Sequence, residues 1–574
     1  MKARIRFAPV DAATLAFDTP VQVLTAPCVE QVQPVLAAAH AAAKQGYWVV
    51  GCVAYEAAPA FDRALSVRES EGSLPLAVFA VYESPVPGAA KVEGSFRCGP
   101  WQAEISRARF DTDMAGIEAD IRAGRFYQTN HTTRLRADFA GDAEALFNSL
   151  VQAQPGGYSC FLDGGPEANW QILSVSPELS FDWSPDGLLT TRPMKGTAPR
   201  FADPSADQAA ADALRASAKE QAENLMIVDL LRNDLSRVAQ TGSVDVPHLF
   251  DLEALPSLWQ MTSTVQCKTC PSLNLTDVFA ALFPCGSITG APKVTAMQSI
   301  AEREMSPRGA YCGALGIIRP GGHATFSVGI RTVVIEGDRA ECGIGSGITI
   351  DARPDSEFAE WQAKRRFLWR ASAGFQLLET LRLEAGEYWL LERHLARMAA
   401  SAEHFGFAWN YDEAARVLTD LVQGKSQGAW RVRLLADRDG RFTAEAHALE
   451  PTPDEYRVRL ATTPVQSDNE FLRHKTTERG VYGAHQPEVG LFDVLLYNER
   501  DELTEFTKGN VVVELDGRLL TPSLACGLLP GALRAELLAT GEIAEAIITR
   551  ADLARATGLW FINGVRGRVR AKLA

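Results

Sequence analysis

The chain has 574 residues, with 57 basic and 71 acidic side chains and a formal net charge of −14. Apolar residues make up 46% and charged residues 22% of it, which excludes a disordered or fibrous chain, and no apolar run reaches the roughly 18 residues of a membrane span. The acidic balance argues against a nucleic-acid-binding protein, whose usual mark is a basic patch.

In chain order, short β-rich runs alternate with an alanine-rich helix near 33–45 over residues 1–110. Apolar residues at helical spacing predict one long helix from about 212 to 239. A Pro-Asp pair predicts the start of a second long helix, over about 354–372. Strands with helices outside them predict an α+β domain over residues 1–370. The glycine-punctuated strands between the two long helices are 313–318, 325–331 and 342–348.

The pattern restarts at residues 370–375. A strand over 377–383, a turn at Gly386 and a helix over about 391–405 begin a second unit. This unit alternates strands and helices to the end of the chain, which predicts an α/β domain over residues 371–574.

The ten cysteines are sparse and irregularly spaced, which indicates free thiols in a reducing compartment rather than a disulfide framework. Cys267 and Cys270 form a C-x-x-C pair with no second pair or histidine at zinc-finger spacing. The first residues lack an apolar core of signal-peptide length. We therefore expect a cytoplasmic protein.

Two pairs of glutamates occur on the two predicted long helices. Glu220 and Glu223 are three residues apart on the first, and Glu357 and Glu360 are three apart on the second. Spacing of three places each pair on one helix face. Two such faces that converge would suit Mg²⁺, which prefers oxygen ligands and is often completed by water and an anionic substrate group. The alternative is that both pairs lie on solvated helix faces.

Further motifs in this part of the chain carry a family resemblance. In order they are Arg192-Pro193-Met194-Lys195-Gly196-Thr197, the run from Glu223 to Leu235, Gly286-Ser287-Ile288-Thr289-Gly290-Ala291-Pro292-Lys293, and Gly345-Ser346-Gly347. Over about residues 45–370 the chain resembles the chorismate-utilising enzymes, the family that includes aminodeoxychorismate synthase component I and anthranilate synthase component I. The resemblance implies a β-sandwich with outer helices.

The resemblance also implies the binding residues. Glu223 and Glu360 would bind Mg²⁺, with Glu220 and Glu357 behind them, and the metal would bind one carboxylate of chorismate. The other carboxylate would be held by side chains and backbone amides, because an arginine fork donates two parallel bonds to a carboxylate. These groups would be Arg331, Tyr311 and the amides of Gly345 to Gly347, while Ser287 would contact substrate.

Two residues carry the implied chemistry. Glu178 matches the family's general acid, which protonates the departing 4-hydroxyl and needs a raised pKa to hold its proton. Lys195 stands where anthranilate synthases have alanine, and in the family its amine attacks C2 of chorismate before ammonia enters at C4. Such a lysine must be partly deprotonated, so desolvation or nearby positive charge must lower its pKa. Thr129 replaces the water-activating lysine of isochorismate synthases, which favours nitrogen as the incoming nucleophile.

Two features of this unit leave questions open. Gln260 stands where the family usually has a histidine, and an amide can donate a hydrogen bond but cannot carry a proton. The chain has no cysteine on a Gly-x-Cys-x-Gly elbow of glutaminases. We therefore expect ammonia to come from a separate glutamine amidotransferase subunit.

The second unit resembles the class IV pyridoxal-phosphate enzymes over about residues 375–574. The motifs are His474-Lys475-Thr476-Thr477-Glu478-Arg479, Thr504-Glu505-Phe506-Thr507-Lys508-Gly509-Asn510, Gly527 to Arg534 and Asn563-Gly564-Val565-Arg566-Gly567. This family includes branched-chain and D-amino-acid aminotransferases and aminodeoxychorismate lyase. The resemblance implies a fold-type IV α/β domain, commonly with its site at a homodimer interface.

Each part of the cofactor has an implied partner in this unit. Lys475 would bind it covalently, and Glu505 would face the pyridine nitrogen and keep it protonated. Arg397 would bind the phosphate. The backbone amides of Ala532 and Leu533 would bind it too, because they open a helix and free amides there bind anions. Asn510 would lie beside the ring. The family's first strand is either missing before residue 376 or supplied by the linker, which leaves cofactor retention open.

The two resemblances together predict amination of chorismate to 4-amino-4-deoxychorismate, followed by loss of pyruvate to give 4-aminobenzoate for folate synthesis. Two alternatives remain. The first is an anthranilate synthase-like component fused to a class IV aminotransferase. The second is a catalytically silent C-terminal domain that docks a partner.

Overall fold

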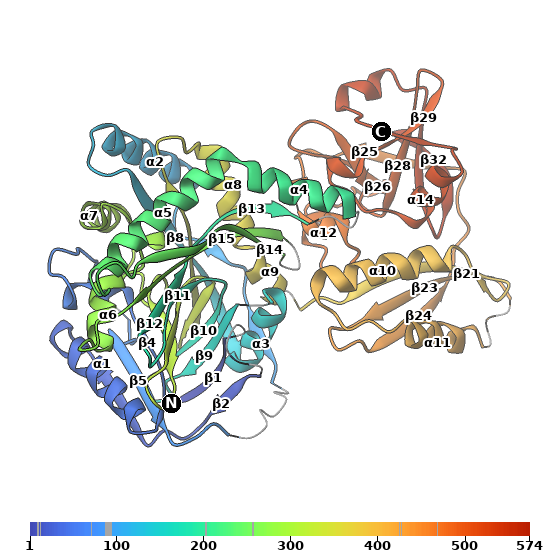
Figure 1. Ribbon diagram of the computed structural model, residues 1–574. Helices are drawn as coiled ribbons and strands as arrows, with labels where there is room; N and C mark the ends of the chain where they lie inside the picture. Colours follow the sequence, from blue (N-terminus) through green and yellow to red (C-terminus); the bar gives the residue numbers. More distant parts are fainter. Residues whose placement is uncertain are drawn as a thin grey trace. The chain divides into compact units, whose positions relative to one another are not determined.

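The computed structural model describes residues 1–574 except 8–10, 12, 71, 87–93, 156, 201–203, 255–257, 373, 424, 426 and 468. The described chain divides into two compact units, Met1–Ser372 and Ala373–Ala574 (Figure 1). Among the described helices, none has both the length and the apolarity that a membrane crossing requires.

The first unit is a β-sandwich whose two sheets bury apolar side chains against each other. Ile5 and Ile172 of one sheet share a core with Val50 and Leu315 of the other. One sheet has the order β16 (Gly290–Ala291), β8 (Gln128–Gly141), β20 (Arg339–Ile348), β19 (Thr332–Glu336), β10 (Trp170–Ser176), β9 (Tyr158–Asp163), β1 (Lys2–Phe7) and β2 (Leu15–Phe17), with β6 (Phe96–Cys98) and β7 (Gln102–Ala103) on β8. The other has the order β13 (Met194–Pro199), β15 (Leu258–Lys268), β12 (Leu188–Arg192), β11 (Leu179–Trp183), β18 (Ala324–Val328), β17 (Ala314–Ile318), β4 (Trp48–Val53), β5 (Ala77–Tyr82) and β3 (Gln22–Ala26), with β14 (Asp245–Ala254) on β15.

Helices cover the outer faces of both sheets. Phe110, Leu150 and Trp361 of three helices join the core on the first sheet, and Leu36 and Phe279 join that on the second. The predicted α+β sandwich is thereby confirmed. The helices on the first sheet include α2 (Arg107–Arg122), α3 (Ala143–Ala153), α8 (Pro354–Lys364) and α9 (Arg366–Ser372), and those on the second include α1 (Val29–Lys44), α5 (Ala218–Ser236) and α6 (Leu275–Leu282). The unit also holds α4 (Pro204–Ala216), α7 (Lys293–Arg303) and the short helices η1 (Tyr55–Ala60) and η2 (Gly286–Ile288).

The two long helices predicted from the sequence are each broken into two, so that part of the prediction was wrong. The first becomes α4 and α5 because Ser217 leaves the helical conformation and its hydroxyl accepts a bond from the Glu220 amide. A serine at this position caps the start of a new helix. The second becomes α8 and α9, which meet at Arg365. In Figure 1, α5 lies across β15, against which it packs.

The described part of the second unit contains two sheets. The smaller has the order β22 (Glu387–Tyr388), β21 (Leu377–Glu384), β23 (Ala429–Ala436) and β24 (Phe442–Ala448), with α10 (Leu391–Phe405) and α11 (Tyr411–Val422) packed on it. The larger has the order β27 (Leu503–Phe506), β26 (Asp493–Tyr497), β25 (Glu455–Leu460), β32 (Gly567–Leu573), β31 (Gly558–Asn563), β28 (Gly509–Leu515), β29 (Arg518–Pro522) and β30 (Ala544–Ala546). An additional pairing of β27 with β28 closes this sheet into a barrel. Short helices α12 (Glu470–Arg473), α13 (Gly480–Gly483), α14 (Ala532–Ala539), η3 (Leu524–Cys526) and η4 (Arg550–Ala554) complete the unit.

The start of β21 is bonded to the segment that carries Lys475. The Leu378 amide donates to the Lys475 carbonyl at 3.0 Å, and the Thr477 amide donates to the Gln376 carbonyl at 2.9 Å. This segment therefore pairs with the start of β21.

Candidate active sites

Lys195 lies on a β-bulge of β13. Met194 pairs with Thr262 and Thr197 pairs with Gln260, so β13 has one residue more than β15 between these pairs. Gly196, the second residue of the bulge, has φ 83°, which favours glycine. A Cβ there would lie 2.9 Å from the Glu220 Oε2 atom and 3.1 Å from its Cβ atom, so close packing also favours glycine.

The Lys195 amine lies over the backbone of β20. A Cβ on Gly347 would be 3.2 Å from Lys195 Nζ, so the missing side chain leaves room for the amine. The side chain of Lys195 is half-buried, and its charge acts on Glu178, Glu220 and Glu360. The bulge therefore brings the predicted nucleophile to the predicted acid and to the predicted metal ligands.

Glu178 lies between β10 and β11 and is 5% exposed. Its Oε1 atom has no hydrogen-bond partner among the described residues. Burial raises the pKa of Glu178 to about 7, against the opposing effects of the Ser287 hydroxyl, Lys195 and Lys364. A carboxyl group with this pKa and an unpaired oxygen can give a proton to a bound molecule at neutral pH.

The four predicted metal ligands lie within one electrostatic cluster. Burial and then the charge of Glu223 raise the pKa of Glu220. Burial also raises the pKa of Glu357, and the charge of Glu360 raises it further. The Ser346 hydroxyl, which donates to Glu357 Oε2 at 2.6 Å, opposes this rise only in part. Such crowding of like charges is what a bound cation relieves.

The carboxylate cluster is not a preformed metal cage. Over the described part of the chain, no three His, Cys, Asp or Glu side chains come close enough to hold a metal ion together. Mg²⁺ needs only one or two carboxylates when waters and an anionic substrate complete its shell. The carboxylates of the two predicted ligands, Glu223 on α5 and Glu360 on α8, are oxygen donors of the kind that suits Mg²⁺.

Arg331 and Tyr311 lie near each other, and the charge of Glu360 reaches Arg331. Arg331 has φ 51° and its Nη1 donates to the Gln154 Oε1 atom at 3.0 Å. Its guanidinium also stacks over the Phe367 ring, 5.2 Å from the centroid. Gln154 and Phe367 are both neutral, so the guanidinium is suited to an incoming carboxylate.

Ser287 and Gly345 hold fixed positions around the site. Ser287 lies in η2, is 8% exposed, and its hydroxyl is 3.3 Å from the Cys285 thiol. A Cβ on Gly345 would overlap the carbonyl of His131 on β8. Only glycine therefore lets these two strands approach so closely at the floor of the site.

Lys364 is a site residue that the sequence analysis missed. Its Nζ is 2.6 Å from Glu360 and donates to the Gly345 carbonyl at 2.8 Å. It is four residues after Glu360 on α8, a spacing that places an acid and a base on one helix face. That spacing was the signal by which it could have been found.

In the second unit, Lys475 and Glu505 form the centre of the predicted cofactor site. Burial and then the charge of Arg397 lower the pKa of Lys475 to about 8. Glu505 is 3% exposed, and burial raises its pKa to about 8. The Tyr482 hydroxyl donates to Glu505 Oε1 at 2.8 Å, and Asn510 Nδ2 donates to Oε2 at 3.2 Å. Tyr482 was not identified from the sequence.

Arg397 is held by a buried carboxylate that the sequence analysis also missed. Glu379 on β21 is fully buried and accepts two bonds from the guanidinium, from Nε and Nη2, each at 2.7 Å. Arg397 Nη1 donates to the Pro530 carbonyl at 3.1 Å. His394 Nδ1 bonds to Glu379 at 2.7 Å, while its buried Nε2 has no partner among the described residues.

The predicted phosphate end of this site lies at the start of α14. Ala532 and Leu533 are the first residues of this helix, and Gly531 precedes it. A Cβ on Gly531 would overlap Asn510 Oδ1, so the helix start and the ring-side asparagine are in direct contact. A lysine with a lowered pKa, a buried carboxylate, an arginine and free helix amides together fit pyridoxal phosphate.

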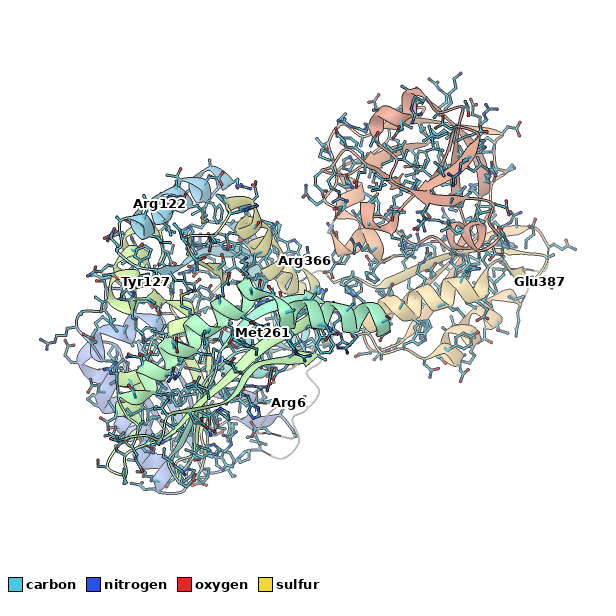
Figure 2. The ribbon with its side chains drawn as sticks, turned by 45° about the horizontal axis from the view of Figure 1, so that its top comes forward. Arg6, Arg122, Tyr127, Met261, Arg366 and Glu387 are labelled. Atoms are coloured by element: carbon cyan, nitrogen blue, oxygen red, sulfur yellow. The ribbon has the colours of Figure 1, made fainter. Side chains whose placement is uncertain are left out.

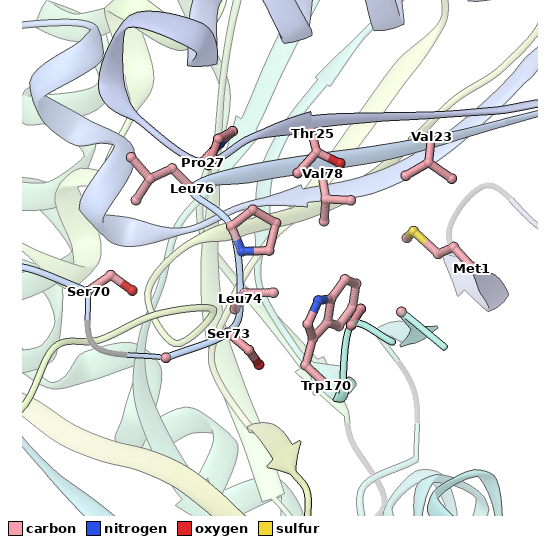
Figure 3. Close-up of a pocket in the computed structure, with 14 residues that line it drawn as sticks. Met1, Val23, Thr25, Pro27, Ser70, Ser73, Leu74, Leu76, Val78 and Trp170 are labelled. Carbon is pink, nitrogen blue, oxygen red and sulfur yellow. The ribbon is translucent and has the colours of Figure 1, made fainter. Parts of the chain in front are cut away.

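A cavity of about 420 Å³ in the first unit lies apart from these residues (Figure 3). The residues that line it include Val23 and Thr25 of β3, Val78 of β5, Leu76 directly before β5, and Trp170 of β10. None of the predicted site residues is among those that line it in the described chain.

Similarity to known proteins agrees with the division of the chain into two units. Residues 88–370 match the chorismate binding enzymes and residues 376–573 match the class IV amino-transferases. The chain therefore joins a chorismate-binding domain to a class IV amino-transferase domain. Both family resemblances predicted from the sequence are thereby confirmed.

Three relatives illustrate the similarity. The aminodeoxychorismate synthase component 1 of Salmonella typhimurium is 41% identical over 263 residues, 45% of this fusion chain and 56% of that protein. The solved anthranilate synthase component I of Streptococcus pneumoniae shares its fold, with a TM-score of 0.55 and 24% identity over 64% of this chain and 92% of that one. A solved Mesorhizobium loti chain, provisionally assigned as an amino-acid aminotransferase, is 42% identical over 35% of this chain and all of its own, with a TM-score of 0.34. The fusion chain spans about half the length of the curated relatives it matches.

Proposed function

We propose that this chain makes 4-aminobenzoate from chorismate in two steps. The first unit replaces the 4-hydroxyl of chorismate with an amino group, and the second unit removes pyruvate from the product. The observation that carries the proposal is the position of the Lys195 amine. It lies over Gly347 and interacts electrostatically with Glu178. The similarity of the first unit to aminodeoxychorismate synthase component 1 supports it.

In the first step the nitrogen lone pair of Lys195 forms a bond to C2 of chorismate. The bond between C4 and the hydroxyl oxygen breaks, and Glu178 gives its proton so that water leaves. Ammonia then forms a bond to C4, and the bond between Lys195 and C2 breaks to return the free amine. Because its pKa is about 7, Glu178 holds its proton in part of the molecules at neutral pH.

Other residues of the first unit hold the substrate. Arg331, Tyr311 and the amides of Gly345 to Gly347 bind one carboxylate, and Ser287 contacts the ring. Glu223 and Glu360 would hold Mg²⁺, with Glu220 and Glu357 behind them. When bound there, the metal would supply positive charge for the other carboxylate.

In the second unit, Lys475 is the proton carrier. Pyridoxal phosphate, when bound, supplies an electron sink beside the substrate amino group. Lys475, with its pKa near 8, takes the proton from C4 and returns it to the departing enolpyruvyl group. Glu505, fixed by Asn510, would hold the pyridine nitrogen, and Arg397 with the amides of Ala532 and Leu533 would hold the phosphate.

A separate glutamine amidotransferase supplies the ammonia in this proposal. The relatives of the first unit are named as component 1 of their enzymes, which supports a second component. Equal turnover of the purified chain with glutamine and with ammonium salt would contradict this part.

The test is incubation with chorismate, ammonium and Mg²⁺, with and without pyridoxal phosphate, followed by identification of the aromatic product. We expect 4-aminobenzoate only when the cofactor is present, no amination by Lys195→Ala, and accumulation of 4-amino-4-deoxychorismate by Lys475→Ala. Lys268→Ala is the matched control, because this lysine lies at the surface and pairs with Asp186. Formation of 2-aminobenzoate, or full amination by Lys195→Ala, would refute the proposal.

A further inference from the structure

Gln260 lies on β15 directly beside the bulge that carries Lys195. Its side chain is 9% exposed, and its Nε2 donates to the Gly196 carbonyl at 2.9 Å and to the Met261 carbonyl at 3.2 Å. Met261, the next residue on β15, is labelled in Figure 2. One amide thus joins the backbone of the bulge to the backbone of the strand that supports it.

The bulge needs such a bond because the regular strand pairing is interrupted there. Between Met194 and Thr197 the register with β15 shifts, and a bulged residue is left without its ladder bond. Gly196 has φ 83° and no side chain, so its peptide units rotate more freely than those of other residues. The bond from Gln260 fixes the orientation of the Gly196 carbonyl from the neighbouring strand.

The direction of the Lys195 side chain depends on that orientation, because Lys195 and Gly196 share the bulge. We propose that Gln260 is a positioning residue, whose amide holds the Gly196 carbonyl and thereby aims the Lys195 amine over Gly347 toward the substrate. This inference rests on the proposed role of Lys195 in amination. The role requires only an N–H donor, which an amide supplies without carrying a proton.

The experiment compares two glutamines that make the same bond. Gln260→Met keeps the length and burial of the side chain but cannot donate. Gln240→Met is the matched control, because Gln240 Nε2 also donates to a backbone carbonyl, that of Thr269, at 2.9 Å. Ammonia-dependent kcat and KM for chorismate are measured, together with the rate at which Lys195 gains the mass of chorismate less one water when ammonia is left out.

We expect kcat and the rate of adduct formation to fall about 10- to 100-fold in Gln260→Met, since a small misplacement of a reacting group has effects of this size. KM should stay within about twofold, because substrate contacts are kept. Equal rates in Gln260→Met and Gln240→Met would overturn the inference. A raised KM with an unchanged rate of adduct formation would also overturn it, because Gln260 would then serve substrate binding.

Two further variants keep the test decisive. Gln260→His restores an N–H donor. Partial recovery of adduct formation relative to Gln260→Met supports positioning, and no recovery refutes it. Where Gln260→Met fails to fold, a folded Gln260→His variant that forms no adduct refutes it as well. Lys195→Ala separates the inference from the proposed function. Full amination by Lys195→Ala refutes the proposed function. If Lys195→Ala loses amination while Gln260→Met keeps the wild-type rate, only the role of Gln260 is refuted.

Discussion

Glu178 of the first unit and Glu505 of the second are buried to nearly the same extent, at 5% and 3% exposure. Burial raises the pKa of both, to about 7 and about 8. Their hydrogen bonds differ. Glu178 Oε1 has no partner among the described residues, whereas Tyr482 and Asn510 each donate to one oxygen of Glu505.

This difference indicates two uses of a raised pKa. A carboxyl group with an unpaired oxygen can pass its proton to a substrate, whereas one held by two donors is fixed in place for a constant partner. Glu379 adds a third case, because it is also fully buried yet Arg397 and His394 overcome the effect of burial and hold its pKa below the usual range. Burial alone therefore does not decide what a carboxylate does; its partners decide.

The largest expected effect is on amination activity, which should depend on Glu178 and not on Glu505. Glu178→Gln keeps the shape but cannot give a proton, so amination should fall by about 10²- to 10⁴-fold, the usual contribution of a general acid. Conversion of supplied 4-amino-4-deoxychorismate by the second unit should stay unchanged. Glu505→Gln is the reciprocal control, and amination undiminished in Glu178→Gln would remove the distinction between the two residues.

The second effect is on stability and depends on pH. In the folded chain Glu178 keeps its proton up to about pH 7, whereas in the unfolded chain it loses it near 4.5. Between these values the folded state binds more protons, so the free energy of unfolding of the first unit falls as pH rises, by about 3 kcal/mol at 1.36 kcal/mol per pKa unit.

Glu178→Gln should remove this loss. The free energy of unfolding of the variant, compared with that of the wild type, should therefore be higher at pH 8 than at pH 5. Denaturant unfolding of the first unit at the two pH values measures it. Glu167→Gln, at an exposed position, is the control. The same difference between pH 5 and pH 8 in wild type and Glu178→Gln would show that Glu178 is ionised throughout this range.

The sequence predicted much of the fold and supplied the candidate residues of both sites, for physical reasons that particular residues show. Strand and helix periodicity is local, so the helix Leu391–Phe405 was found within its observed bounds. The break at Ser217 was also readable, because Ser217-Ala218-Lys219-Glu220 has the S-x-x-E spacing of a capping box.

Contacts between distant segments could not be read in this way. The bond from Arg331 to Gln154 joins residues 177 positions apart, and that from Gln260 to Gly196 joins residues 64 apart. Tyr482 reaches Glu505 only because the barrel brings α13 to β27. Such partners depend on how strands pair, which no local pattern determines, and they are the groups that adjust the pKa and the orientation of the residues found by motif.

The third prediction concerns Glu379, the buried carboxylate with two cationic neighbours. Glu379→Gln removes the charge that holds the Arg397 fork, and hydrogen bonds to charged groups contribute about 1.5–3 kcal/mol. We expect pyridoxal phosphate to bind about 10- to 100-fold more weakly, measured by titration of its absorbance. Glu384→Gln is the control on the same strand, because Glu384 is exposed and pairs with Arg382. Equal affinity in the two variants would contradict a role of Glu379 in holding Arg397.

The smallest effect tests whether partners or burial set the pKa of Glu505. The Tyr482 hydroxyl opposes the effect of burial on this group, so Tyr482→Phe should raise the pKa of Glu505 above about 8, through a hydrogen bond that contributes about 1 kcal/mol. Infrared difference spectra, with Glu505→Gln as the reference, isolate the signal of the protonated Glu505 carboxyl group. In Tyr482→Phe the titration midpoint of this signal should lie at higher pH than in the wild type. An unmoved midpoint would mean that burial alone sets this pKa, and Glu505 would then differ from Glu178 in geometry but not in its electrostatics.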